Sequence, residues 1–106
     1  MGLQYRMLAR EVCAEVAKPE WWSDEGLKAL SARVVRAAPG DWHANQMRAC
    51  VLCGQDDAWE AGPRSAAELK KAATHYERAA ALSSAPAVKA QFAEDAAWCR
   101  RQVEGM

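Results

Sequence analysis

Apolar residues recur every three or four positions along most of the chain, which is the spacing of amphipathic helices. Proline and glycine residues divide this pattern into five periodic segments. We therefore predict an all-α protein of about five antiparallel helices. The expected helices cover residues 3–18, 22–38, 42–53, 66–82 and 86–103, with a loop over 54–65. The length of 106 residues is typical of one domain, so we expect a single domain over 1–106.

Several expected helix ends carry residues that favour starting or stopping a helix. Asp41 stands where an N-cap is needed, and Gly54 stands where a C-cap is needed. Ser65 and Glu68 have the spacing of a capping box at the start of the fourth helix. Pro86 is suited to the first turn of the fifth helix. These signals place the helix ends independently of the apolar pattern.

The apolar stripes predict which side chains form the core. The third segment leaves two registers open, with Ala49 in the core, which we favour, or with Met47 and Val51. The expected core positions elsewhere are Leu27, Leu30, Val34 and Ala38, then Leu69, Ala72, Ala73, Tyr76, Ala79 and Ala80, then Val88, Phe92, Ala96, Cys99 and Val103.

Composition supports the helical interpretation and narrows the function. The chain has 24 alanines, seven valines, one threonine and no isoleucine, which disfavours a β-sheet protein. The formal net charge is zero, so nothing indicates nucleic-acid binding or a polybasic membrane contact. Alanine leaves a core poor in large aliphatic side chains. We therefore expect modest stability, or stabilisation by a neighbouring protein.

The stretch from residue 42 to 86 resembles a tetratricopeptide repeat, a helix–turn–helix unit of about 34 residues. Ala72, Tyr76 and Ala79 match the small–aromatic–small pattern of the second helix, and Pro86 falls two residues later than the proline of the pattern. The resemblance implies a degenerate tetratricopeptide-like array of right-handed helical hairpins. A compact helical bundle is the alternative.

Three short segments also resemble a set of uncharacterised repeat-like algal and protist proteins, a family with no known activity to carry over. These segments are 45–49, 64–69 and 75–80.

Tetratricopeptide arrays bind partners in a groove lined by the first helix of each hairpin, so the resemblance implies protein or peptide binding. With Ala49 in the core, the groove face of the third helix comprises His43, Gln46, Cys50 and Cys53. With Met47 and Val51 in the core, that face rotates by about half a turn. The family's carboxylate-binding clamp needs several asparagines, whereas Asn45 is the single asparagine here.

Cys50 and Cys53 form the most suggestive local motif. The pair is compatible with half of a zinc site that His43, Cys13, Cys99 or His75 completes, or with a redox pair. A redox pair needs a helix N-terminus to lower its thiol pKa, whereas this pair falls in the last turn of its expected helix. We favour small apolar fillers in a close helix interface, with no cofactor and no metal.

Three tryptophans are candidates for partner contacts. Trp21 and Trp22 stand at the start of the second helix, and adjacent helical residues point about 100° apart, so both cannot face one core. Trp59 lies in the long loop among acidic residues. We expect its ring to fold back and cap the hairpin with one edge exposed. The expected partner-binding residues are His43, Gln46, Trp59 and Trp21.

The sequence offers little for catalysis. His43 and His75 are the only candidates for a general base, and there is no glycine loop that cradles phosphate. Arg6 and Arg10 interrupt the first apolar stretch, so we expect no signal peptide, and no stretch is long enough to span a membrane. We expect a soluble intracellular protein of the cytoplasm or an organelle stroma, not an enzyme. Its expected role is that of a protein interaction module, an adaptor or a small subunit of a larger assembly, with a metal- or redox-linked thiol protein as the alternative.

Overall fold

A computed structural model describes residues 21–54 and 58–106. These residues contain four helices and no strand, which confirms the all-α class. The helices are α2 (Asp24–Ala37), α3 (Trp42–Cys53), α4 (Ala66–Leu82) and α5 (Pro86–Glu104). Their ends lie within two residues of the four corresponding expected ranges. The helix expected over 3–18 lies outside the described residues.

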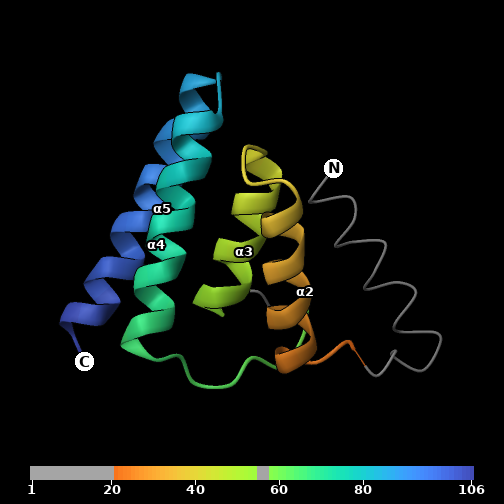
Figure 1. The fold of residues 1–106 in the computed structure, drawn as a ribbon. Coiled ribbons are helices and arrows are strands. Elements are labelled where there is room, and N and C mark those ends of the chain that lie inside the picture. Colours follow the sequence, from red (N-terminus) through yellow and green to blue (C-terminus); the bar gives the residue numbers. More distant parts are fainter. Residues whose placement is uncertain (1–20, 55–57) are drawn as a thin grey trace.

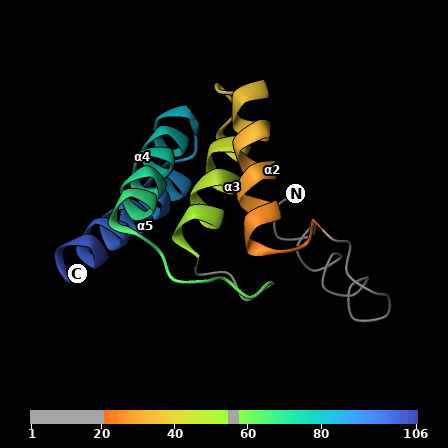
Figure 2. The same cartoon turned by 60° about the horizontal axis from the view of Figure 1, so that its bottom comes forward.

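The four helices form a compact unit in which each helix packs mainly on the next one along the chain. α3 lies between α2 and α4, and α5 covers the other side of α4 (Figures 1 and 2). Short connections join α2 to α3 and α4 to α5, whereas residues 58–65 run along one end of the molecule before α4 (Figure 1).

Local hydrogen bonds explain where α3 and α4 begin and end. The side chain of Asp41 accepts a hydrogen bond from the backbone N–H of His43 at 3.0 Å and caps α3. Gly54 ends α3 with a left-handed φ of 67°, which glycine adopts without a Cβ penalty. Ser65 and Glu68 form the expected capping box at 3.1 and 3.0 Å. All of these ends use residues within a few positions of the cap.

The main core lies between α3, α4 and α5. Small side chains at the contact points allow the helices to approach closely, because Ala49, Ala72 and Ala79 are all fully buried. Aromatic rings fill the remaining space, and the rings of Tyr76 and Phe92 lie 6.3 Å apart. The buried positions of α4 and α5 follow the expected stripes, and they are Leu69, Ala72, Ala73, Tyr76 and Ala79, then Phe92, Ala96 and Cys99.

The expected stripe of α2 needs correction. Of that stripe Leu27 is buried, Leu30 and Val34 are half-buried, and the second buried residue of α2 is Ser31. A serine is buried there because Arg48 reaches across from α3. Its Nη1 donates hydrogen bonds to the backbone carbonyl of Lys28 at 2.8 Å and to the Ser31 hydroxyl at 3.1 Å. The interface between α2 and α3 is therefore partly polar.

Candidate functional site

A hollow of about 340 Å³ lies where α2, α3 and α4 meet, and we call it the basic groove. Its floor includes the apolar side chains of Ala32 and Val35 from α2. The other lining residues are Arg36 from α2, Arg48 from α3, and Lys71, Thr74, His75 and Arg78 from α4.

Among the residues that the structure describes, the lining contains four cationic side chains and no carboxylate, although the whole chain carries 14 basic and 14 acidic residues. The cations act on one another: burial and then the neighbouring charge of Arg36 lower the pKa of Arg48. The charge of Glu68 acts in the opposite direction and raises the pKa of Arg48. The Glu68 carboxylate itself is paired with Lys28, 2.7 Å away. The basic groove therefore concentrates positive charge in an otherwise neutral protein.

A buried asparagine supports one side of the basic groove. Asn45 is fully buried, and its Nδ2 donates hydrogen bonds to the backbone carbonyls of Pro39 and Asp41, each at 3.0 Å. Its Oδ1 is thus an acceptor, and it lies 3.0 Å from His75 Nδ1. Nδ1 must therefore carry a proton and donate it, which leaves Nε2 as the nitrogen that titrates.

The pKa of His75 is lowered from its ordinary value. Burial makes the largest contribution, followed by the charges of Arg78, Arg48 and Lys71. Each of these disfavours a further positive charge on the imidazole ring. His75 is therefore neutral at pH 7 and adds no charge to the four cations of the basic groove.

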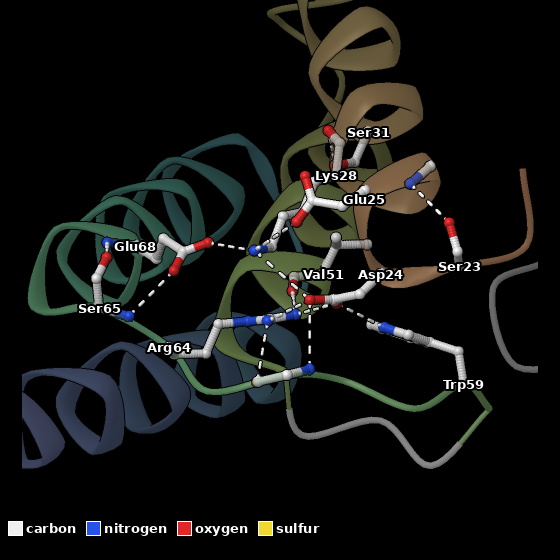
Figure 3. A network of polar contacts seen from close by, with 12 residues as sticks. Ser23, Asp24, Glu25, Lys28, Ser31, Val51, Trp59, Arg64, Ser65 and Glu68 are labelled. Carbon is white, nitrogen blue, oxygen red and sulfur yellow. Dashed lines mark hydrogen bonds and ion pairs between the residues drawn. The ribbon is translucent and has the colours of Figure 1, made fainter.

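A second polar cluster, around Asp24, holds the long loop in place (Figure 3). The Asp24 carboxylate accepts hydrogen bonds from Trp59 Nε1 at 2.9 Å and from the backbone N–H of Gly62 at 3.3 Å. It also accepts hydrogen bonds from both terminal nitrogens of Arg64, at 2.7 and 2.5 Å. These contacts, with that of Arg64 the strongest, hold the pKa of Asp24 well below its usual range.

The Asp24 cluster extends to the neighbouring helix ends. Arg64 Nη2 also donates to the backbone carbonyl of Val51 near the end of α3, at 2.9 Å. Lys28 lies 3.5 Å from Asp24 and 2.7 Å from Glu68, which caps α4 (Figure 3). Lys28 and the capping hydrogen bond lower the pKa of Glu68 to about 2. This cluster joins α2, α3, the loop and α4, and we regard it as structural.

The structure places the predicted tryptophans at the start of α2. Trp59 is half-buried and directs its ring nitrogen to Asp24 on α2, whereas the sequence analysis expects it to cap the hairpin of α3 and α4. Trp22 donates from Nε1 to the backbone carbonyl of Ala58 at 3.2 Å. Trp21 is 47% exposed and packs edge-to-face on Trp22. The two neighbouring rings thus differ in exposure, as the argument from helical geometry requires.

Cys50 and Cys53 do not share an open face of α3. Cys53 is buried, and the Tyr76 hydroxyl lies 3.6 Å from its sulfur and 3.4 Å from that of half-buried Cys50. Burial and these sulfur neighbours raise the pKa of Tyr76 far above its usual range. Hydrogen bonding with Cys53 and burial likewise raise the pKa of the Cys99 thiol. The raised pKa of Cys99 is the opposite of what an activated thiol needs.

Within the described part of the chain, the other candidate ligands do not join the cysteine pair in a metal site. His43 is exposed and stacks on the Trp42 ring with 3.5 Å between ring centroids. Among residues 21–54 and 58–106, no group of three His, Cys, Asp or Glu side chains has a metal-binding arrangement. Cys13 lies outside the described residues.

The predicted face of α3 and the basic groove are different surfaces. His43 is exposed and Gln46 is half-buried, so both lie on the less buried side of α3. Arg48, five residues after His43, is rotated from it by about 140° and lines the basic groove. The basic groove was not predicted from the sequence. A signal was present on α4, because Lys71, His75 and Arg78 recur at helical spacing.

Within the described part of the chain, no helix has the length and apolar character needed to cross a membrane. In comparisons with known proteins, the chain matches no family model, no curated protein and no solved structure.

Proposed function

We propose that this chain is a non-catalytic protein interaction module, an adaptor or a small subunit of a larger assembly. We propose further that it binds an acidic segment of a partner protein in the basic groove. The observation that carries the proposal is the lining of the groove, whose described residues include four cations and no carboxylate in a chain of zero net charge.

The lining is complementary to a short acidic segment. The cations attract carboxylates and steer an acidic partner toward the groove. Ala32 and Val35 offer a small apolar surface, and the aliphatic stems of the arginines extend it. An acidic segment with one or two apolar residues therefore matches both the charge and the surface of the groove.

The polar side chains of the groove support binding rather than catalysis. Thr74 uses its hydroxyl to donate a hydrogen bond to the backbone carbonyl of Lys70 at 3.1 Å. His75 uses Nδ1 to hold Asn45. Covalent catalysis needs a nucleophile paired with a general base, and among the described residues no hydrogen bond joins the Thr74 hydroxyl to His75 Nε2.

We propose the tetratricopeptide-like array as the architecture of the module. It is supported by the residues that resemble the repeat and by the way in which each helix packs mainly on the next along the chain. In this scheme α2 and α4 are the second helices of consecutive repeats, and they flank the basic groove together. A compact bundle remains the alternative architecture.

A peptide-binding titration tests the proposed function. The probe is a fluorescein-labelled peptide of ten glutamates, and the readout is fluorescence polarisation at low and high salt. We expect binding that weakens with salt, because exposed charges are screened. In R36E/R78E the affinity should fall by about tenfold or more, since like charges replace attractive ones.

The matched control is R33E/R101E, which has the same net charge as R36E/R78E but changes exposed arginines outside the groove lining. We expect the control to retain most of the affinity of the parent. Absence of binding by the parent, or equal losses in the two variants, would refute the proposed function.

A further inference from the structure

The three arginines of the basic groove come from three different helices and surround one hollow. We infer that the groove binds a phosphorylated serine or threonine side chain of the partner, and that Arg36, Arg48 and Arg78 hold it. This inference rests on the proposed function and specifies the ligand of the same groove.

The number of guanidinium groups favours a phosphate over a carboxylate. Each guanidinium is a planar fork of N–H donors that pairs with two oxygens at a time. A carboxylate has two oxygens and one charge, so it cannot satisfy three such forks. A phosphorylated side chain has three acceptor oxygens and a charge near −2 at neutral pH. It therefore matches three arginines that line one hollow from three helices.

Arg48 is already positioned to receive this group. Its Nη1 is fixed by the backbone carbonyl of Lys28 and by the Ser31 hydroxyl. Both hydrogen bonds use that one nitrogen, so Nη2 and Nε are without hydrogen bonds to other described residues. A side chain that is held before binding loses little conformational freedom when the ligand arrives.

Arg36 and Arg78 complete the arrangement from the two sides of the groove. Both are exposed, so they retain freedom to close on a ligand that rests against Arg48. The charges of Arg36 and Arg48 repel each other: burial is the largest cause of the lowered pKa of Arg48, and the charge of Arg36 lowers it further against the opposing charge of Glu68. A dianion relieves this repulsion more than a single carboxylate does.

A single phosphate also fits the molecule better than a nucleic-acid chain. A nucleic acid presents phosphates at short, regular intervals and needs a basic stripe or patch that follows them. Here the basic side chains converge on one hollow of about 340 Å³, while acidic and basic residues are equal in number over the whole chain. The partner group is therefore an isolated phosphorylated side chain.

Three labelled peptides test the inference. They share one host sequence of glycine, alanine and glutamate, and they carry at the centre either phosphoserine, serine or two glutamates. The two-glutamate peptide matches the charge of the phosphopeptide. By fluorescence polarisation we expect the phosphoserine peptide to bind about tenfold more tightly than the two-glutamate peptide, because bidentate charge-assisted hydrogen bonds add to the charge attraction.

Lysine substitutions keep the positive charge of arginine but remove its planar guanidinium group, so they test the two contributions separately. We expect R36K and R78K to weaken binding of the phosphoserine peptide more than binding of the two-glutamate peptide, and so to remove most of the preference for phosphoserine. R33K is the matched control and should retain the preference. Both groove variants change exposed side chains, so their folding is expected to match that of the parent.

The outcomes distinguish this inference from the proposed function. If the ten-glutamate peptide binds but phosphoserine and two glutamates bind equally, the phosphate inference is wrong and the proposed function stands. If neither the ten-glutamate peptide nor the phosphoserine peptide binds, both are wrong. Displacement of the phosphopeptide by a single-stranded oligonucleotide at lower concentration than by the unlabelled phosphopeptide would also overturn the inference.

Discussion

The hydrogen bond between Asn45 and His75 links the beginning of α3 to the middle of α4 beside the basic groove. The same amide holds the backbone of Pro39 and Asp41 at the turn that precedes α3. One fully buried side chain therefore orients the turn, the helix and a groove residue together. A change in the orientation of the Asn45 side chain would displace His75 and the cations around it.

His75 makes stability depend on pH in a defined direction. Its pKa in the folded protein lies below the ordinary value of 6.5, so just below pH 6.5 the unfolded chain binds a proton that the folded protein does not. The contribution of His75 to stability is therefore full above about pH 6.5 and is lost as the pH falls below it. Urea unfolding at pH 7.5 and 5.5 should show this loss.

The variant H75Q isolates the effect, because glutamine does not titrate. We expect H75Q to lose less stability than the parent between the two pH values. Glu68 acts in a lower window, since its pKa is lowered from 4.5 to about 2 and its stabilisation is lost only as the pH falls below 4.5. Equal losses in H75Q and the parent would contradict the assignment to His75.

Gly54 is a position where a side chain is poorly tolerated. Its φ of 67° costs an L-residue about 1–2 kcal/mol, and an added Cβ would lie 2.8 Å from Arg64 Nε. We expect G54A to lower the free energy of unfolding by at least about 1 kcal/mol. The matched control is G40A, because a Cβ on Gly40 has nothing within 4 Å, and its effect should stay within about 0.5 kcal/mol. Similar urea midpoints for the two variants would refute the strain at Gly54.

At the scale of the helices, α3 and α4 are joined by a long loop instead of a short turn, and the Asp24 cluster holds this loop in place. Arg64 and Asp24 are 40 residues apart in sequence, and their side chains are only 6% and 16% exposed. Removing one partner of a buried ion pair leaves the other charge without compensation, which costs about 3–5 kcal/mol. We expect D24N to lower the free energy of unfolding by about 3 kcal/mol.

An exposed ion pair in the same molecule provides the control. Arg100 and Glu77 lie 2.6 Å apart, close to the shortest Arg64–Asp24 distance, but their side chains are 48% and 53% exposed. E77Q should therefore change stability by less than about 1 kcal/mol in urea unfolding. A D24N effect as small as that of E77Q would show that the Asp24 cluster does not hold the loop.

The helices were predictable because their ends depend on nearby residues. Asp41, Gly54 and Ser65 act on backbone groups within a few positions, so the sequence alone indicates them. The burial of Ser31 was not predictable, because it depends on Arg48, which lies 17 residues later on another helix. The Asp24 cluster escaped prediction for the same reason.

The basic groove was predictable only in part. Lys71 and Arg78 recur on one side of α4 with helical spacing, and that row is visible in the sequence. The charges of Arg36 and Arg48 join the row through the packing of α2 and α3 on α4. No local pattern contains that information, so the partner surface predicted from the sequence lies on another side of α3.

At the scale of the whole molecule, alanine sets how closely the helices approach. Ala72 is fully buried between α4 and its neighbours, so a larger side chain there has no space. We expect A72L to cost about 1–3 kcal/mol by overpacking. A81L, on the exposed side of α4, should change the urea midpoint little. The opposite order of the two variants would show that the helices are not closely packed through Ala72.

The central claim is that the module receives acidic partners in the groove between α2 and α4. The most direct measurement is an NMR titration of the ¹⁵N-labelled full chain with the ten-glutamate peptide. We expect the largest amide and side-chain shifts around Arg36, Arg48 and residues 71–78, with little change on the outer side of α5. Shifts centred on His43 and Gln46 or on Trp21, with none in the basic groove, would contradict the account.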